Sequence, residues 1–279
     1  MNRDDREIIP IFIGMKCLNF CLAVFFCSIS SSLFAQTPQP IEADLVKSFK
    51  KIDYWMEKGR DTSFDTLIAS DSLDKANEGF AKKLKHYSEK NPAIINYPFK
   101  SLGKEGPAIL SSSDGLFRIY SWDTWTGGTM HVFENVLQYK SGGKIVNIID
   151  TAKNEEDYIY TYEDVYTFRV NNKTYYLTTY LGIFSNKDSG RGIRIFDIEK
   201  GKLNKDVKLI KTASGMHGHL YYDYDFFSVV DTPFKNRPTI TFDNATNTIS
   251  LPLVDRNHKV TNKFILYKFT GQYFERVKN

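Results

Sequence analysis

The densest group of residues with useful chemistry lies at positions 121–131, where two tryptophans, two glycines, an aspartate and a histidine occur together. Apolar sugar faces stack on indole rings, while hydroxyl groups need polar partners such as imidazole. We therefore predict a ligand site that stacks a glycan or peptide group on Tyr120, Trp122 and Trp125, with His131 as the polar contact. The alternative is that these rings stabilise a sheet or fill a core, which aromatic residues do routinely.

The glycine pair in this segment predicts how its side chains are arranged. Glycines at 127 and 128 suit a two-residue hairpin turn, because glycine supplies the positive φ that such turns require. That register sets Trp122 opposite Phe133. Alternation along the strands then puts Asp123 and Trp125 on one face. The opposite face would hold Tyr120, Trp122, Thr124, His131 and Phe133.

Two of the five histidines lie on either side of Gly218, in a run that also carries acidic residues. His217, His219 and Asp225 share one face if this run is an extended strand. Imidazoles two residues apart lie roughly 6.6 Å apart, so both could reach one zinc ion. His217 and Asp225 would be roughly 26 Å apart on a straight strand, so a metal site needs a third ligand from His131 or a bend at Gly218. The alternative is the polar face of a half-buried antiparallel strand.

The sequence contains no other strong catalytic pattern. A Gly-x-Ser-x-Gly elbow, a P-loop, a Gly-x-Gly-x-x-Gly turn and a His-Glu-x-x-His motif are all missing from it. We therefore predict no catalytic residues and no cofactor. The classes that stay open are an exported binding protein, which we favour, a metal-dependent hydrolase, and a structural protein of the cell envelope. The expected partner is a glycan, a peptide or an envelope protein.

Residues 41–92 are the only part of the chain with helical periodicity. Apolar side chains recur there at spacings of three and four in two stretches, which predicts two amphipathic helices. The stripes are Leu45, Phe49, Ile52 and Met56, then Leu73, Ala76, Phe80 and Leu84. Asp71 or Ser72 can cap the second helix, and Asn91-Pro92 ends it. We expect this pair to pack on the sheet that follows.

From Ala108 onward the period changes to two, which predicts antiparallel β structure, and we assign 93–279 to this β domain. The predicted strands are 117–122, 130–139, 144–149, 165–170, 174–181, 192–198, 207–210, 220–229, 238–242, 248–253, 263–269 and 273–277. A faint repeat of roughly 50 residues, a period expected of propeller blades, relates 118–149, 166–198 and 239–277. The predicted fold is mainly β: an antiparallel meander arranged as a partial propeller-like stack, a sandwich or an open barrel, with a short N-terminal helical pair.

The N-terminal segment predicts export. Met15-Lys16 precedes an apolar stretch, and Ala35 is small enough to stand before a signal-peptide cleavage site. We assign 1–35 to a signal peptide whose true start is Met15, and 36–40 to a short linker. A membrane span needs roughly 20 continuous apolar residues, so we expect no stable span after cleavage. The mature protein would be periplasmic or extracellular.

Cysteine and charge content narrow the chemistry further. All three cysteines, at positions 17, 21 and 27, lie in the predicted leader, so the mature chain would hold no thiol and no disulfide. The net charge of +4 is dispersed, whereas nucleic-acid binding usually shows a concentrated basic patch. We therefore predict no nucleic-acid partner.

Three short patches of the sequence carry a resemblance to other proteins. They are Ser113-Asp114-Gly115 through His131, the leader end Phe34-Ala35-Gln36, and the stretch 264–274. Together they resemble uncharacterised secreted β-rich proteins of Bacteroidetes-type bacteria. The resemblance covers only these short patches, implies no particular activity and assigns no functional residue.

Overall fold

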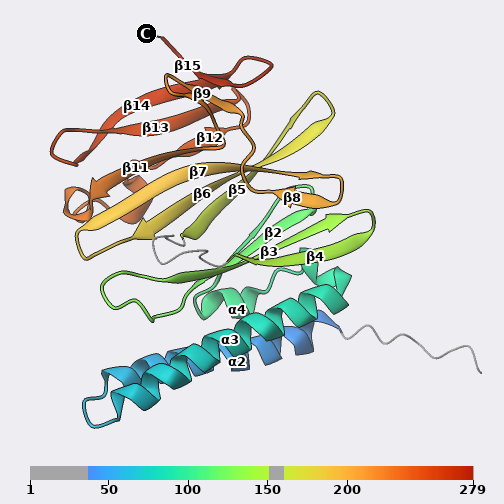
Figure 1. The fold of residues 1–279 in the computed structure, drawn as a ribbon, viewed down its shortest axis with the longest axis vertical. Helices are drawn as coiled ribbons and strands as arrows, with labels where there is room; N and C mark the ends of the chain where they lie inside the picture. The colour runs from blue at the N-terminus through green and yellow to red at the C-terminus, as the bar shows by residue number, and fades with distance from the viewer. Residues whose placement is uncertain (1–36, 151–159, 279) are drawn as a thin grey trace, which may run out of the picture. The chain divides into compact units, whose positions relative to one another are not determined.

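The computed structural model describes residues 37–150 and 160–278. The predicted signal peptide, 1–35, lies outside the described residues. Pro38–Asn279 forms one compact unit, in which helices come first and strands follow (Figure 1). The prediction of a mainly β fold with an N-terminal helical pair is confirmed.

The two predicted helices are α2 (Pro38–Arg60) and α3 (Thr66–Lys90), which pack against each other. Their predicted apolar stripes are buried or half-buried. A 3-10 turn η1 (Pro92–Asn96) and a short helix α4 (Lys100–Lys104) complete the helical segment. The predicted periodicity therefore identifies the correct faces of both helices.

Both long helices begin earlier than predicted. Helix α2 starts at Pro38, inside the predicted linker, because proline is well tolerated in the first turn of a helix. Helix α3 is capped by Asp65 rather than by Asp71 or Ser72, and the Asp65 carboxylate accepts backbone hydrogen bonds from Leu67 and Ile68. Residues 66–68 at the start of α3 are exposed, so no apolar stripe marks them in the sequence.

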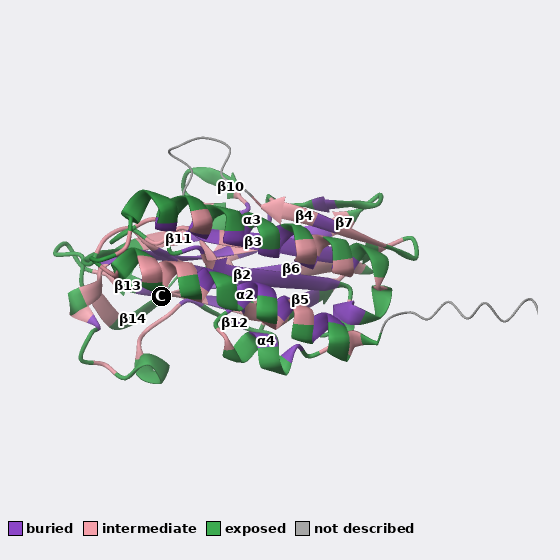
Figure 2. Ribbon diagram, turned by 90° about the horizontal axis from the view of Figure 1, so that it is seen from below, coloured by how far each residue is buried: buried purple, intermediate pink, exposed green. Residues whose placement is uncertain are grey.

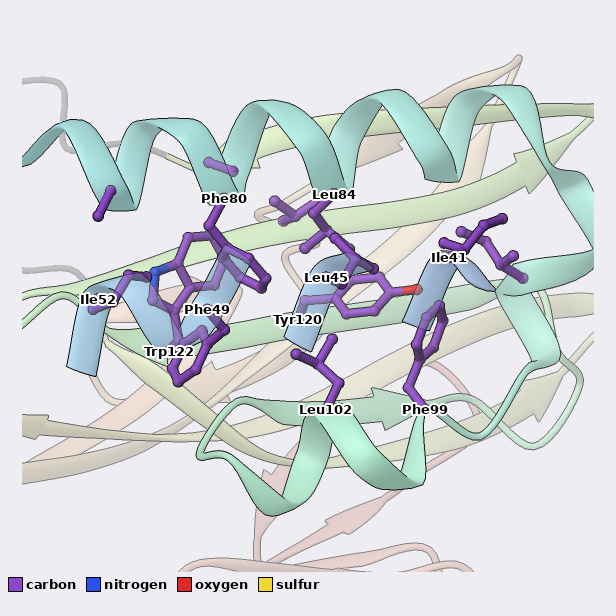
Figure 3. Packing of buried hydrophobic residues seen from close by; sticks show 14 of the residues in the cluster. Ile41, Leu45, Phe49, Ile52, Phe80, Leu84, Phe99, Leu102, Tyr120 and Trp122 are labelled. Carbon is purple, nitrogen blue, oxygen red and sulfur yellow. The ribbon is translucent and has the colours of Figure 1, made fainter. Parts of the chain in front are cut away.

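The first sheet has the strand order β1-β2-β3-β4. Its strands are β1 (Ala108–Ser111), β2 (Phe117–Asp123), β3 (Phe133–Ser141) and β4 (Lys144–Asp150). The helical pair covers one face of this sheet, as predicted, and the two share a hydrophobic core (Figure 3). That core includes Leu45, Phe49, Phe80, Leu84, Phe99, Tyr120 and Trp122.

The second sheet has the order β11-β7-β6-β5, with β8 paired to β7. Its strands are β5 (Thr161–Val170), β6 (Lys173–Ile183), β7 (Asp188–Glu199), β8 (Lys202–Asn204) and β11 (His219–Asp225). Strand β11 returns to this sheet after two strands of the third, so it is an edge strand added from a distance along the chain. It is followed by two 3-10 turns, η2 (Phe226–Ser228) and η3 (Phe234–Asn236).

The third sheet has the order β10-β9-β15-β14-β13-β12. Its strands are β9 (Ile210–Thr212), β10 (Gly215–His217), β12 (Thr241–Asp243), β13 (Thr248–Val254), β14 (Val260–Phe269) and β15 (Phe274–Arg276). The pair β9–β15 is parallel, while its other pairs are antiparallel.

Hydrophobic clusters give the order of the layers. Phe117 and Leu137 of the first sheet share one cluster with Tyr176 and Phe196 of the second. Another cluster joins the opposite face of the second sheet to the third sheet. The helical pair, first sheet, second sheet and third sheet therefore form successive layers, and buried residues run along the central strands (Figure 2).

The predicted repeat corresponds to these layers. Segments 118–149, 166–198 and 239–277 contain the main strands of the first, second and third sheets respectively. The sheets stay separate among the described residues, so the arrangement is a layered stack rather than a barrel. Gly142-Gly143 and Asn171-Asn172 form two-residue turns with positive φ, as predicted. Some predicted bounds are wrong: 130–139 becomes a strand only at Phe133, 207–210 meets β9 at Ile210 alone, and 220–229 stops at Asp225, where η2 begins. The predicted β domain at 93–279 also begins with η1 and α4, and its first strand starts at Ala108.

Candidate functional site

Tyr120 and Trp122 lie inside the core, not on a ligand-binding face. They are 0% and 2% exposed and point from β2 toward the helical pair (Figure 3). The Trp122 ring packs edge-on against Phe80, with ring centroids 4.9 Å apart. Its Nε1 donates a hydrogen bond of 3.1 Å to Asn77 Oδ1. The prediction that these two rings stack on a ligand is wrong, because the helices already cover them.

The hairpin register also differs from the prediction. Asp123 lies opposite Phe133 and Trp122 lies opposite Glu134, which is one residue away from the predicted pairing. Residues 124–132 form a longer connection, called the site loop below, in place of the predicted two-residue turn. A shift of one residue exchanges the faces on which side chains meet. Phe133 therefore shares a face with Asp123, on the side of the second sheet, and not with Trp122.

Asp123 and His131 form the most distinctive chemical pair of the site loop. His131 Nδ1 is hydrogen-bonded to Asp123 Oδ2, while Asp123 Oδ1 accepts the backbone N–H of Trp125 at 2.8 Å. A carboxylate only accepts, so Nδ1 donates and Nε2 is an acceptor when the ring is neutral. The backbone N–H of His131 donates to the Ile183 carbonyl at 3.0 Å. The site loop is thereby attached to the end of β6 in the second sheet.

Trp125 is the exposed member of the three predicted aromatic rings, at 38%. Its φ of 60° lies in the left-handed region that non-glycine residues rarely adopt. Its ring lies 5.8 Å from the His131 ring, and the Arg60 guanidinium lies 5.9 Å from its centroid. A Cβ on Gly127 would lie 2.0 Å from the Met130 carbonyl oxygen. The site loop is therefore tightly folded, and strain of this kind clusters at ligand sites.

A pocket of about 250 Å³ opens beside His131. Liquid water takes about 30 Å³ per molecule, so this volume suits a group the size of one sugar ring or one amino-acid side chain. The walls come from the site loop, the ends of β6 and β7, and the segment 226–237 that follows β11. They include Thr129, His131, Asn186, Arg191, Phe234 and Arg237.

Arg191 gives the pocket a buried positive charge with its own counter-ion. It is 6% exposed, pairs with Glu163 and donates a hydrogen bond of 3.0 Å to Thr239 Oγ1. Burial is the largest single effect and opposes its charge, but the Glu163 carboxylate together with Tyr224 and Tyr222 outweighs burial, and the net effect raises the pKa of Arg191. Burial also raises the pKa of Glu163, against the attraction of Arg191. Arg191 and Glu163 therefore form an ion pair in the pocket wall, and their charges neutralise each other.

Arg237 gives the same pocket a second positive charge. It belongs to the segment 226–237, which exposes Phe227 and Phe234 at 59% and 69%. Its guanidinium lies 5.3 Å from the Phe226 ring and 5.8 Å from the Phe234 ring. The pocket therefore combines aromatic rings, an imidazole and two guanidinium groups.

The predicted metal ligands do not come together. His217 ends β10 of the third sheet and bonds Ser214 at 2.9 Å, whereas His219 begins β11 of the second sheet. Asp225 stands at the far end of β11, where it caps η2. Across the described ranges 37–150 and 160–278, no three His, Cys, Asp or Glu side chains form a group able to hold a metal ion. The bend at Gly218 separates the histidines into two sheets, so the predicted metal site is wrong.

The sequence pattern identifies the pocket residue His131 and its neighbour Trp125 but misses the other walls of the pocket. Arg191 lies in a continuous run of buried residues on β7, and nothing in its neighbourhood marks it as a pocket residue. The segment 226–237 carries a usable signal. Its apolar run at 226–230 has no alternation and precedes Pro233, which disfavours the predicted strand and indicates an exposed, irregular apolar segment.

Comparison with known protein-family models gives no match, and comparison with curated proteins gives no significant match. Within the part of the chain that the structure describes, every helix is too short or too polar to cross a membrane.

Proposed function

We propose that this protein is an exported binding protein that holds one sugar ring of a glycan in the pocket beside His131. The observation that carries the proposal is the Asp123–His131 pair at a pocket whose walls include the exposed ring of Phe234. Ligand pockets typically combine an apolar lining with a few fixed polar groups.

Each part of the pocket has a role in this proposal. Phe234 lines the pocket and is 69% exposed, so it supplies an apolar face for stacking. Trp125 lies outside the lining and packs beside the His131 ring. Asp123 fixes the imidazole of His131, so that Nε2 accepts a hydrogen bond from a ligand hydroxyl. The side chain of Asn186, on the β6–β7 turn, offers both a donor and an acceptor. Such fixed partners favour a polyhydroxylated ring over a purely apolar ligand.

Isothermal titration calorimetry tests the proposal with a panel of neutral and acidic methyl glycosides. Phe234→Ala should weaken binding of any sugar that the wild type binds by several-fold, since a ring contact is worth about 0.5–1.5 kcal/mol. His131→Ala should weaken it as well. Tyr54→Ala is the matched control, because Tyr54 is an exposed aromatic residue on α2 that does not line the pocket. Binding that is unchanged in both pocket variants would overturn the proposal.

A second candidate function is hydrolysis of an ester linkage, which the same Asp–His pair favours. His131 Nε2 would take a proton from water as the water oxygen attacks the ester carbonyl, and the departing alcohol would then receive that proton. Release of p-nitrophenol from p-nitrophenyl acetate, compared between the wild type and His131→Ala, tests this candidate. Equal rates would remove it.

Export is part of the proposal and rests on the leader at 1–35. N-terminal sequencing of protein recovered from a bacterial periplasmic fraction or culture medium tests it directly. A mature chain that begins near Gln36 supports export. A chain that keeps residues 15–35 and stays in the cytoplasm contradicts it.

A further inference from the structure

Arg237 is held in a fixed orientation at the pocket. Its Nε donates to the Thr232 carbonyl at 2.9 Å, and one terminal nitrogen donates to the Val230 carbonyl at 3.4 Å. The Phe226 and Phe234 rings flank its guanidinium. These contacts leave further N–H groups of the guanidinium for a ligand, because arginine carries five donors in a planar fork.

The charges around the pocket are unevenly balanced. Arg191 is paired with Glu163, and His131 is paired with Asp123. Among the residues that the structure describes, no carboxylate lies within 4 Å of the Arg237 nitrogens. Arg237 is half-buried and lines the pocket, so a ligand anion there would meet a partly desolvated cation with no competing protein partner. Arginine–carboxylate pairs in such settings are strong and directional.

We propose that the ligand is an acidic sugar whose carboxylate pairs with Arg237, that is, a hexuronic acid residue of a glycan. This inference rests on the proposed function, because it assigns the ligand class of the same pocket. The carboxylate forms two parallel hydrogen bonds with the Arg237 guanidinium. The ring then reaches across the pocket, where His131 Nε2 and Asn186 bond its hydroxyl groups and Phe234 contacts its apolar face.

The same carboxylate chemistry occurs at the C-terminus of a peptide, but the pocket favours the sugar. Its volume of about 250 Å³ accommodates one ring. Its polar groups lie on separate walls, as the hydroxyls spread around a sugar ring require. A peptide ligand is therefore an outcome that the experiment must be able to reveal.

The experiment compares methyl glucuronide with methyl glucoside, which differ at the carboxylate, by calorimetry on the mature chain. The wild type should bind the glucuronide about tenfold or more tightly than the glucoside, as expected for a charge-assisted bidentate pair. Arg237→Gln should remove that preference and leave glucoside binding within about twofold. Arg237→Lys should keep part of the preference, because lysine retains the charge without the fork. Arg276→Gln, an exposed arginine on β15, is the matched control and should change neither affinity.

The outcomes separate the two proposals. Equal affinity for both sugars in the wild type, or an equal loss for both in Arg237→Gln, would overturn the acidic-sugar inference while leaving sugar binding intact. Failure of both sugars to bind would overturn the proposed function and this inference with it. An N-acetylated dipeptide with a free carboxylate that binds in an Arg237-dependent manner, when the glucuronide does not, would replace the sugar by a peptide. Thermal melts of all three arginine variants confirm that each is folded.

Discussion

Asn77 connects the helical core to the start of the site loop, and its substitution gives the sharpest test of the fold. The side chain is 5% exposed and makes three hydrogen bonds. Its Nδ2 donates to the carbonyls of Leu73 and Thr124, both at 3.0 Å, and its Oδ1 accepts from Trp122 Nε1 at 3.1 Å. Two of these three partners lie on the strand end and loop that carry the candidate site.

We expect Asn77→Leu to lower the free energy of unfolding by about 2–6 kcal/mol. Leucine keeps a similar volume, but it leaves the Trp122 indole N–H and the Thr124 carbonyl without this partner. A buried polar group without a partner costs about 1–3 kcal/mol, and two such groups give the stated range. Because domains are stable by only about 5–15 kcal/mol, the loss should be evident in urea unfolding followed by far-UV circular dichroism.

A double-mutant cycle with Trp122→Phe isolates the bond between the two side chains. Phenylalanine removes the indole donor, so Asn77→Leu should cost less in that background, with a coupling of roughly 1–2 kcal/mol. Lys75→Leu is the control on the same helix, since Lys75 is exposed and should change stability by no more than about 0.5 kcal/mol. Additive effects in the cycle, or a cost of Asn77→Leu no larger than that of the control, would refute the reasoning.

Three further substitutions test other features. Burial, reinforced by the negative charge of Glu78, raises the pKa of Glu134 in the folded state, and Glu134 Oε2 is buried without a hydrogen-bond partner. The protonated form of Glu134 therefore favours folding. The stability that this form contributes is lost as pH rises through the folded-state pKa. Glu134→Gln should raise the melting temperature at neutral pH and lose that advantage below about pH 4, and a gain independent of pH would contradict this. Gly127→Ala should abolish ligand binding, because the added Cβ would lie 2.0 Å from the Met130 carbonyl oxygen. Gly103→Ala is the control: its added Cβ would meet no atom within 4 Å, so this variant should bind the ligand normally in the same titration. Asp65→Ala should cost about 1 kcal/mol in chemical denaturation through loss of the α3 cap, and an unchanged midpoint would show that the cap is dispensable.

Periodicity predicts the elements of this protein well because burial imposes it directly. The stripes that contain Phe49 and Phe80 face the first sheet, and the change from period 3.6 to period 2 marks the transition to strands. Turns also read correctly where the loop is short: Gly142-Gly143 and Asn171-Asn172 adopt positive φ at both positions. These signals are local, and each needs only neighbouring residues to be satisfied.

The register between β2 and β3 could not be predicted from local sequence signals in this way. The glycines of the site loop favour a two-residue turn by their local preference, but the loop instead bonds to Ile183 of the second sheet. That partner lies about fifty residues later in the chain, and its contribution cannot be read from the loop itself. The predicted pairing of Trp122 with Phe133 was wrong for this reason, and with it the prediction that Phe133 shares a face with Trp122.

Four consecutive residues show why the site and the core depend on each other. Trp122 enters the helical core, Asp123 orients His131, Thr124 is fixed on both sides, and Trp125 reaches the surface. The Thr124 carbonyl accepts from Asn77, while its backbone N–H and its hydroxyl both donate to the Val132 carbonyl at 2.8 Å. The Asp123 carboxylate is therefore positioned between two anchored residues, one of which is held by the first core. A change at Asn77 should accordingly weaken ligand binding as well as stability, although Asn77 does not line the pocket. This coupling follows from the hydrogen bond between Asn77 and Thr124 and from the alternation of the strand, which turns Trp122 and Asp123 to opposite faces.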